Sequence, residues 1–244
     1  MRLAGIDLAW KSQRNTTAVA FGDLSERCLR LAEIHRALRD LGELVSVIDA
    51  EDELYGIAID APLVINNQSG QRDCEKLLSQ EYGGRCVSCH SSNLVLYKNT
   101  SSVELSRYLE RHGFKHLQDV AVGKCQIECY PHPAILEMFG LPKRLAYKKG
   151  RVSDKKQGQI QLSNHIKTLA QSKVLPLIIG GKNRDCLEEE NIRSLEGAGL
   201  KINEDVLDSI ICLYICALFS KSVVHKTYGC VEDGYIYVPK QRCI

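Results

Sequence analysis

Acidic residues at the ends of apolar segments are the feature that most limits how this chain can fold. Asp7 lies in the strand-like segment of residues 2–10, and Asp60 ends the short apolar run of residues 55–61. A carboxylate beside a buried strand loses hydration, so it stays charged only when a cation or hydrogen-bond donors lie near it. Several such acids in one chain indicate carboxylates that converge on a divalent metal ion.

Three further acids have related contexts. Glu128 falls inside an expected strand at residues 125–130, where acids are uncommon. Asp205 and Asp208 are three apart at the start of an expected helix over residues 204–220, so one helical face can present both. Two of them have a plainer explanation: a water-exposed edge strand for Glu128, and a first-turn acid favoured by the helix dipole for Asp205. Asp208 is harder to dismiss, because it directly precedes the most hydrophobic stretch of the chain.

The acids are more informative together than separately. Alone, Asp7 could cap a turn or helix, and Asp60 could form a turn before Pro62. Two or three carboxylates suit Mg²⁺ or Mn²⁺, which need few protein ligands and keep several waters. A pair of such ions can stabilise both the attacking water and the leaving oxygen of a phosphodiester, without a nucleophilic side chain. The predicted metal ligands are Asp7, Asp60, Asp205 and Asp208, and the predicted catalytic residues are Asp7, Asp60, Glu128 and Asp208.

Composition excludes several other classes of protein. Of the 244 residues, 25% are charged and 44% hydrophobic, and the formal charge of +2 is too small to attract a polyanion by itself. The longest apolar run, residues 210–219, is much shorter than the roughly 20 residues of a membrane span. The first residues lead directly into a strand, so we expect no signal peptide. Eleven cysteines then indicate reduced thiols in a cytoplasmic protein.

The order of apolar segments predicts a single α/β domain over residues 1–244. Strands are expected first, followed by helices alternating with further strands, which gives a mixed sheet whose first three strands are antiparallel and whose faces carry helices. Valines and tyrosines on both sides of Glu232-Asp233-Gly234 predict a C-terminal hairpin. The expected strands cover residues 2–10, 16–22, 28–35, 55–61 and 125–130, and the expected helices cover 37–49, 71–82, 103–112, 134–139, 160–172 and 204–220.

Together these short motifs resemble a family of predicted nucleases of unknown function, domain of unknown function 429. The resemblance is carried by residues 5–9, 58–63, 72–74 and 128–131 and by Asp205-x-x-Asp208, in that order. It implies a ribonuclease H-like fold with a five-stranded mixed sheet. It would place Asp7 on the first strand, Asp60 on the fourth, and Asp205 or Asp208 on the closing helix.

Basic and aromatic residues supply candidates for phosphate binding. Arg72 could hold a phosphate through paired donors, or it could form a surface pair with Glu75. Residues 143–156 contain seven basic residues against one acid, which makes them either a phosphate-backbone track or a solvated loop. Trp10 could stack on a base or pack at the rim of the core. The predicted substrate-binding residues are Arg72, Tyr147, Lys148 and Lys149.

The pair Cys86 and Cys89 is a weak metal signal. With His90 the pair matches a haem-attachment pattern, but no export signal accompanies it. A tetrahedral zinc site needs a second pair of ligands, which the sequence does not locate. Free thiols are therefore the default interpretation, with zinc as the alternative.

These observations favour a metal-dependent phosphodiesterase, a nuclease acting on DNA or RNA. One alternative is a nucleotide-binding phosphotransferase of the actin/sugar-kinase-like superfamily, which would need a glycine-bearing phosphate loop after the first strand. That loop is missing, since residues 7–11 contain no glycine. A second alternative is a nucleic-acid-binding module that keeps the fold without catalysis.

Overall fold

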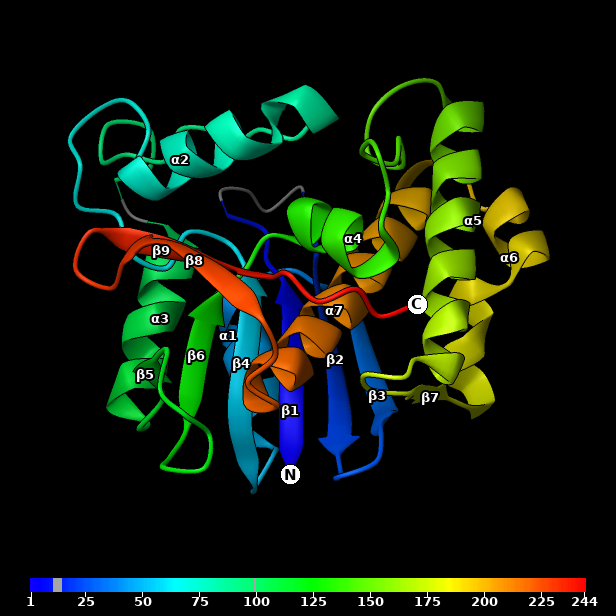
Figure 1. Cartoon of the computed structure of the whole chain (residues 1–244), viewed down its shortest axis with the longest axis horizontal. Helices are drawn as coiled ribbons and strands as arrows, with labels where there is room; N and C mark the ends of the chain where they lie inside the picture. Colours follow the sequence, from blue (N-terminus) through cyan, green and yellow to red (C-terminus); the bar gives the residue numbers. More distant parts are fainter. Residues whose placement is uncertain (11–14, 99) are drawn as a thin grey trace.

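The protein is built on a twisted mixed sheet. The computed structural model describes residues 1–10, 15–98 and 100–244, so most of the turn expected at residues 11–15 lies outside the described residues. The strands follow the order β5-β6-β4-β1-β2-β3-β7 (Figure 1). Strands β1, β2 and β3 pair antiparallel, and β4 and β6 join parallel on the other side of β1. The strands are β1 (Arg2–Asp7), β2 (Thr17–Leu24), β3 (Leu29–Leu38), β4 (Leu54–Asp60), β5 (Lys115–His116), β6 (Cys125–Glu128) and β7 (Leu177–Ile179).

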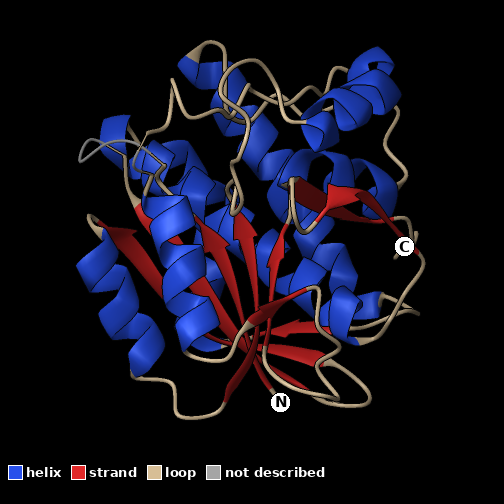
Figure 2. Cartoon of the chain, turned by 90° about the vertical axis from the view of Figure 1, so that its left-hand side faces the viewer, coloured by secondary structure: helices blue, strands red, loops and turns tan. Residues whose placement is uncertain are grey.

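Helices cover both faces of this sheet (Figure 2). Strand β1 is central because its apolar side chains alternate between the two faces, and both faces need cover. Leu3 packs beneath α7, whereas Ala4 and Ile6 pack towards α1 and α3. The α-helices are α1 (Leu41–Asp49), α2 (Asp73–Tyr82), α3 (Ser101–Arg111), α4 (Pro131–Phe139), α5 (Val152–Thr168), α6 (Glu189–Ser194) and α7 (Gly197–Ser220); short 3₁₀ turns cover Gly83–Arg85, Leu169–Gln171 and Gly181–Leu187.

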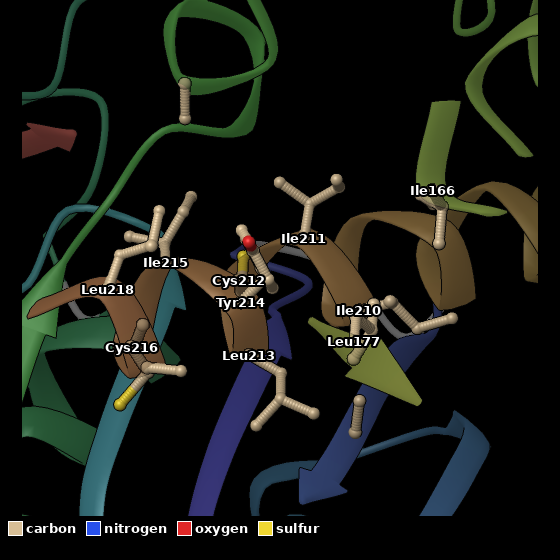
Figure 3. Packing of buried hydrophobic residues seen from close by; sticks show 14 of the residues in the cluster. Ile166, Leu177, Ile210, Ile211, Cys212, Leu213, Tyr214, Ile215, Cys216 and Leu218 are labelled. Atoms are coloured by element: carbon tan, nitrogen blue, oxygen red, sulfur yellow. The ribbon is translucent and has the colours of Figure 1, made fainter. Parts of the chain in front are cut away.

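Helix α7 organises the larger half of the core. It has 24 residues, and its side chains are buried from Asn203 through Leu218. Figure 3 shows its apolar residues packed above the strands, with Leu177 and Ile166 contributing from neighbouring elements. Despite this apolar character, no helix among the described residues has the combined length and hydrophobicity that a bilayer crossing requires.

A C-terminal hairpin, β8 (His225–Cys230) with β9 (Gly234–Pro239), closes the end of the sheet that carries the acids. It packs against α2 through a separate apolar cluster that includes Leu78, Tyr82 and Tyr228. The hairpin, the three antiparallel strands and the helix-flanked mixed sheet confirm the predicted α/β architecture. Helix α4 is capped at Gly140, whose φ of 63° glycine adopts without strain.

Three details of the prediction are wrong. The sheet has seven strands instead of five, because β5 and β7 contain only two and three residues and are too short for alternation to reveal them. Helix α7 begins at Gly197 instead of residue 204, so Asp205 is not in its first turn. Helix α5 begins at Val152, so the basic stretch of residues 143–156 is partly helical.

Candidate metal centre

Strand pairing places the first two acids side by side. Asp7 and Asp60 end β1 and β4, and their Cα atoms are register partners in this parallel pair. Partners across two strands project to the same face of a sheet. Two residues earlier on each strand, Gly5 and Ala58 face α7, so the two carboxylates face α7 as well.

Gly5 determines how closely α7 approaches. A Cβ atom built at Gly5 would lie 1.9 Å from the backbone nitrogen of Leu213 and 2.3 Å from the carbonyl oxygen of Ser209. The helix backbone therefore rests directly on β1, which only glycine permits. This contact brings Asp208, the neighbour of Ser209 in the helix, to the strand ends.

Three carboxylates consequently converge. One oxygen from each of Asp7, Asp60 and Asp208 lies within 4.8 Å of the other two, and among the described residues no other group of acids, histidines and cysteines meets this spacing. The donor set is entirely oxygen, which suits Mg²⁺ or Mn²⁺. The Oδ2 atom of Asp208 is fully buried, and the ammonium of Lys148 lies 2.6 Å from it, so this oxygen already faces a cation. These residues fit a hard divalent cation.

Two consecutive residues of the basic segment enter the centre. The Tyr147 hydroxyl donates a 2.8 Å hydrogen bond to Oδ1 of Asp208, and Tyr147 is fully buried. The Lys148 Nζ atom forms a close ion pair with Oδ2 of Asp208, at 2.6 Å, and lies 3.8 Å from Oδ2 of Asp60. Lys149, the next residue, is exposed and lines the adjoining cavity. Of the predicted phosphate-binding residues, Tyr147 and Lys148 thus contact the acids themselves.

The pKa values in the centre reflect both burial and the repulsion between closely spaced acids. Burial raises the pKa of Asp60 to about 7, and the Asp208 carboxylate adds to the increase while Lys148 opposes it. Burial also raises the pKa of Asp7 well above its ordinary value. Burial alone would lower the pKa of Lys148, but Asp208, Tyr147 and the two strand acids raise it well above its ordinary value. Lys148 is therefore a protonated, positively charged ammonium.

Asp205 is adjacent to the centre but is already paired. Its Oδ1 atom lies 2.6 Å from the Lys201 Nζ atom, one helical turn earlier, and its Oδ2 atom accepts a 2.8 Å hydrogen bond from Thr16. Lys201 also contacts Glu204 at 2.7 Å. Asp208, and not Asp205, joins the two strand acids. The spacing of Lys201 and Asp205, four residues apart on a helix, was a readable signal for this pair.

Glu128 and Arg72 form a second buried cluster. The Arg72 guanidinium donates to both oxygens of Glu128, at 2.9 and 2.5 Å, and its Nε atom donates to Glu75 at 2.8 Å. A further donor reaches the carbonyl oxygen of Val64 at 2.9 Å. Both Arg72 and Glu128 are almost fully buried. The expected pair with Glu75 exists, but it lies in the interior, and the hydrogen bonds to protein acceptors leave Arg72 poorly placed to hold a phosphate.

A cavity of about 650 Å³ opens beside the centre and is lined by Asp7 and Asp60, whereas Asp208 lies buried behind them. Its wall carries aromatic side chains, including Trp10, whose indole nitrogen donates to the carbonyl oxygen of Asp60 at 3.1 Å. Trp10 also meets Tyr97 edge-on, with ring centroids 5.7 Å apart. The basic residues of the lining are Arg144, Lys148, Lys149, Lys155 and Lys201, together with Arg72 of the second cluster.

His132 is a cavity residue that the sequence analysis missed. It follows Pro131 in the first turn of α4 and is 5% exposed, with its ring edge-on to Tyr130 and Tyr147. Burial lowers the pKa of His132 well below its ordinary value, and nearby Lys148 and Arg144 lower it further. It is therefore a neutral imidazole. A histidine between two prolines gave no spacing that could have identified it.

The cysteine pair lies apart from the acids. Cys86 is exposed and Cys89 is half-buried, and neither belongs to a ligand cluster among the residues described. Cys89 lines the same cavity as the acids. The zinc interpretation stays a prediction with no second ligand pair to support it.

These features define a class: a mixed α/β protein with a carboxylate centre at the carboxyl ends of two parallel strands, below a cavity with basic and aromatic walls. A family model described as "Protein of unknown function (DUF429)" matches residues 5–225, and the chain belongs to this family. The resemblance read from the short motifs is therefore confirmed. Comparisons with curated proteins and with solved structures gave no match.

Proposed function

We propose that this protein is a divalent-metal-dependent hydrolase of phosphodiester bonds, a nuclease that acts on DNA or RNA. The observation that carries the proposal is the convergence of Asp7, Asp60 and Asp208 within 4.8 Å, from two strands and a helix. Three acids packed this closely repel one another and lose hydration, so such a cluster is costly unless a cation binds there. The cavity above them gives a substrate direct access.

Mg²⁺ or Mn²⁺ held by these three carboxylates would supply Lewis acidity and activate a water molecule. The remaining residues of the cavity serve the substrate. Arg144, Lys149 and Lys155 lie on the wall, where their charges attract phosphate groups. Trp10 and Tyr130 offer aromatic faces on which a base can stack. The chain thereby positions a phosphodiester over the acids and shields it from bulk water.

A ribonuclease H-like fold is the second part of the proposal. Five of the strands, in the order β6-β4-β1-β2-β3, form the mixed sheet that this fold implies, with the first three antiparallel. Strands β5 and β7 extend this sheet at its two edges. The acids also occur on the expected elements, the first strand, the fourth strand and the long closing helix.

The test is nuclease activity of the full chain with Mg²⁺ or Mn²⁺ on single- and double-stranded DNA and RNA. We expect cleavage that EDTA abolishes and that Asp7→Asn and Asp208→Asn each reduce by on the order of 100-fold or more, as for loss of charge at a metal centre. Asp52→Asn is the matched control, because Asp52 is exposed and remote from the cavity lining. Absence of cleavage on every substrate, with nucleic acid still retained by Asp7→Asn, would favour the non-catalytic binding module.

A further inference from the structure

The most unusual feature of the centre is that a lysine lies inside it. We propose that Lys148 is a permanent cation of the metal centre, so that the centre takes one divalent ion where two would otherwise bind. This inference rests on the proposed function, since it concerns how the same three acids are neutralised. It assigns Lys148 a role next to the metal, in place of the phosphate binding that its sequence context suggested.

The position of the ammonium group is that of a bridging cation. Its Nζ atom is 2.6 Å from Oδ2 of Asp208 and 3.8 Å from Oδ2 of Asp60, so it lies between the helix acid and one strand acid. In two-metal sites, ions about 3.5–4 Å apart are placed in the same way. A second divalent ion between Asp208 and Asp60 would have to displace Lys148.

The opposite side of the centre is open. Among the described residues, Lys148 makes ion pairs with Asp60 and Asp208, and the Asp7 carboxylate makes neither an ion pair nor a hydrogen bond. Asp7 lines the cavity and is partly accessible from it. The position left for a divalent ion is therefore beside Asp7, where the acids meet the cavity.

The chain around Lys148 is fixed, which argues against a side chain that leaves when a metal arrives. Its neighbour Tyr147 is fully buried and hydrogen-bonds Asp208. On the other side of this segment, a Cβ atom built at Gly158 of α5 would lie 2.5 Å from the carbonyl oxygen of Ala146 and 2.7 Å from the Cα atom of Tyr147. Helix α5 thus packs directly on the backbone of Ala146 and Tyr147, which precede Lys148.

The charges support the same stoichiometry. Three carboxylates and one ammonium leave a formal charge of −2, which a single divalent ion neutralises. This count covers the centre itself; beside it, Lys201 lies 2.6 Å from Asp205 and 2.7 Å from Glu204. A second divalent ion would raise the formal charge to +2 beside a retained ammonium in a buried place, which is strongly unfavourable, whereas without the ammonium two ions would leave a formal charge of only +1.

The test counts Mn²⁺ ions bound to the full chain by equilibrium dialysis, with electron paramagnetic resonance to detect coupling between ions. We expect one uncoupled Mn²⁺ in the natural protein and in Lys148→Arg, which keeps the charge. We expect two coupled ions in Lys148→Met, because the acids then carry one more negative charge and the bridging position is free. Lys143→Met is the control and should bind one ion, since Lys143 is exposed and outside the cavity lining.

The outcomes separate the two proposals. Two ions in the natural protein, or one ion in Lys148→Met, would overturn the role of Lys148 and leave a metal centre in place. Binding to Lys148→Met alone would also overturn it, because the lysine would then be filling the sole metal position. No Mn²⁺ on any form would remove the metal centre itself and with it the proposed function. The count on the natural protein decides the inference even if Lys148→Met fails to fold.

Discussion

Two clusters of acids lie beside the same cavity, and each is paired with one basic side chain, yet they are built in opposite ways. In the arginine cluster, Arg72 lies between Glu75 and Glu128. In the aspartate cluster, Lys148 lies among Asp7, Asp60 and Asp208. The arginine cluster comes from a helix start and a strand end, and the aspartate cluster comes from two strand ends and the middle of α7.

The difference lies in how completely the acids are satisfied. Glu128 accepts two hydrogen bonds from the Arg72 fork and a third, at 2.9 Å, from the backbone nitrogen of Leu63. Glu75 accepts from the backbone nitrogens of Arg72 and Ser92. The three aspartates, by contrast, share one ammonium: Lys148 lies 2.6 Å from Asp208 and 3.8 Å from Asp60, and the Asp7 carboxylate has no ion pair or hydrogen bond with any described residue. A saturated acid cluster maintains the fold, whereas an unsaturated one has capacity left for a ligand.

The largest expected effect on stability comes from the arginine cluster, whose acids are fully hydrogen-bonded. Arg72→Met would leave Glu128 buried without its cation, and breaking one partner of a buried pair costs about 3–5 kcal/mol of unfolding free energy. Arg72→Lys should fail similarly, because an ammonium cannot reproduce the two-pronged contact. Urea unfolding measures both, with Arg107→Met on the exposed face of α3 as the control. A loss below about 1 kcal/mol would show that the two clusters do not differ in this way.

The second-largest expected effect comes from moving α7, which carries an acid of the aspartate cluster and none of the arginine cluster. Gly5→Ala would push α7 away from β1, and overpacking of this kind costs about 3 kcal/mol where backbone atoms cannot move aside. The shift should move Asp208 from the strand acids and weaken Mn²⁺ binding, while leaving the Arg72 cluster intact. Calorimetric Mn²⁺ titration alongside urea unfolding tests this, with Gly83→Ala as the control because open space surrounds Gly83. Unchanged Mn²⁺ affinity would contradict the proposed contribution of α7.

The same contrast explains what the sequence could and could not reveal. The central strands, α7 and the convergence of Asp7, Asp60 and Asp208 were predictable, because apolar runs and the acids beside them are local signals. The partners of Glu128 were not, because Arg72 is 56 residues away and its contact depends on how α2 packs. Likewise, nothing local distinguishes Lys148, inside the centre, from Lys149, exposed on the wall. Pairings across the chain require the fold.

Adding Mn²⁺ should change the unfolding free energy by a smaller amount, and only through the aspartate cluster. An ion that binds only the folded state stabilises it by about 2.7 kcal/mol when present at 100 times its dissociation constant. We expect Mn²⁺ to raise the unfolding free energy of the natural protein and of Glu75→Gln by similar amounts. Thermal unfolding with and without Mn²⁺ measures this. An increment that disappears in Glu75→Gln would place the ion in the arginine cluster instead.

The smallest expected effect on stability is also the sharpest distinction between the clusters. Burial raises the pKa of Asp7 well above its ordinary value; Lys148 opposes this increase, and Asp208, Asp205 and Asp60 add to it, so Asp7→Asn removes a carboxylate whose charge the fold disfavours. We therefore expect the metal-free variant to differ from the natural protein by less than about 1 kcal/mol, and in the stabilising direction. The Mn²⁺ increment should vanish in the same variant. A large destabilisation without metal would mean that Asp7, like Glu128, maintains the fold, whereas near-neutral stability with lost Mn²⁺ binding is expected of a residue kept for its ligand.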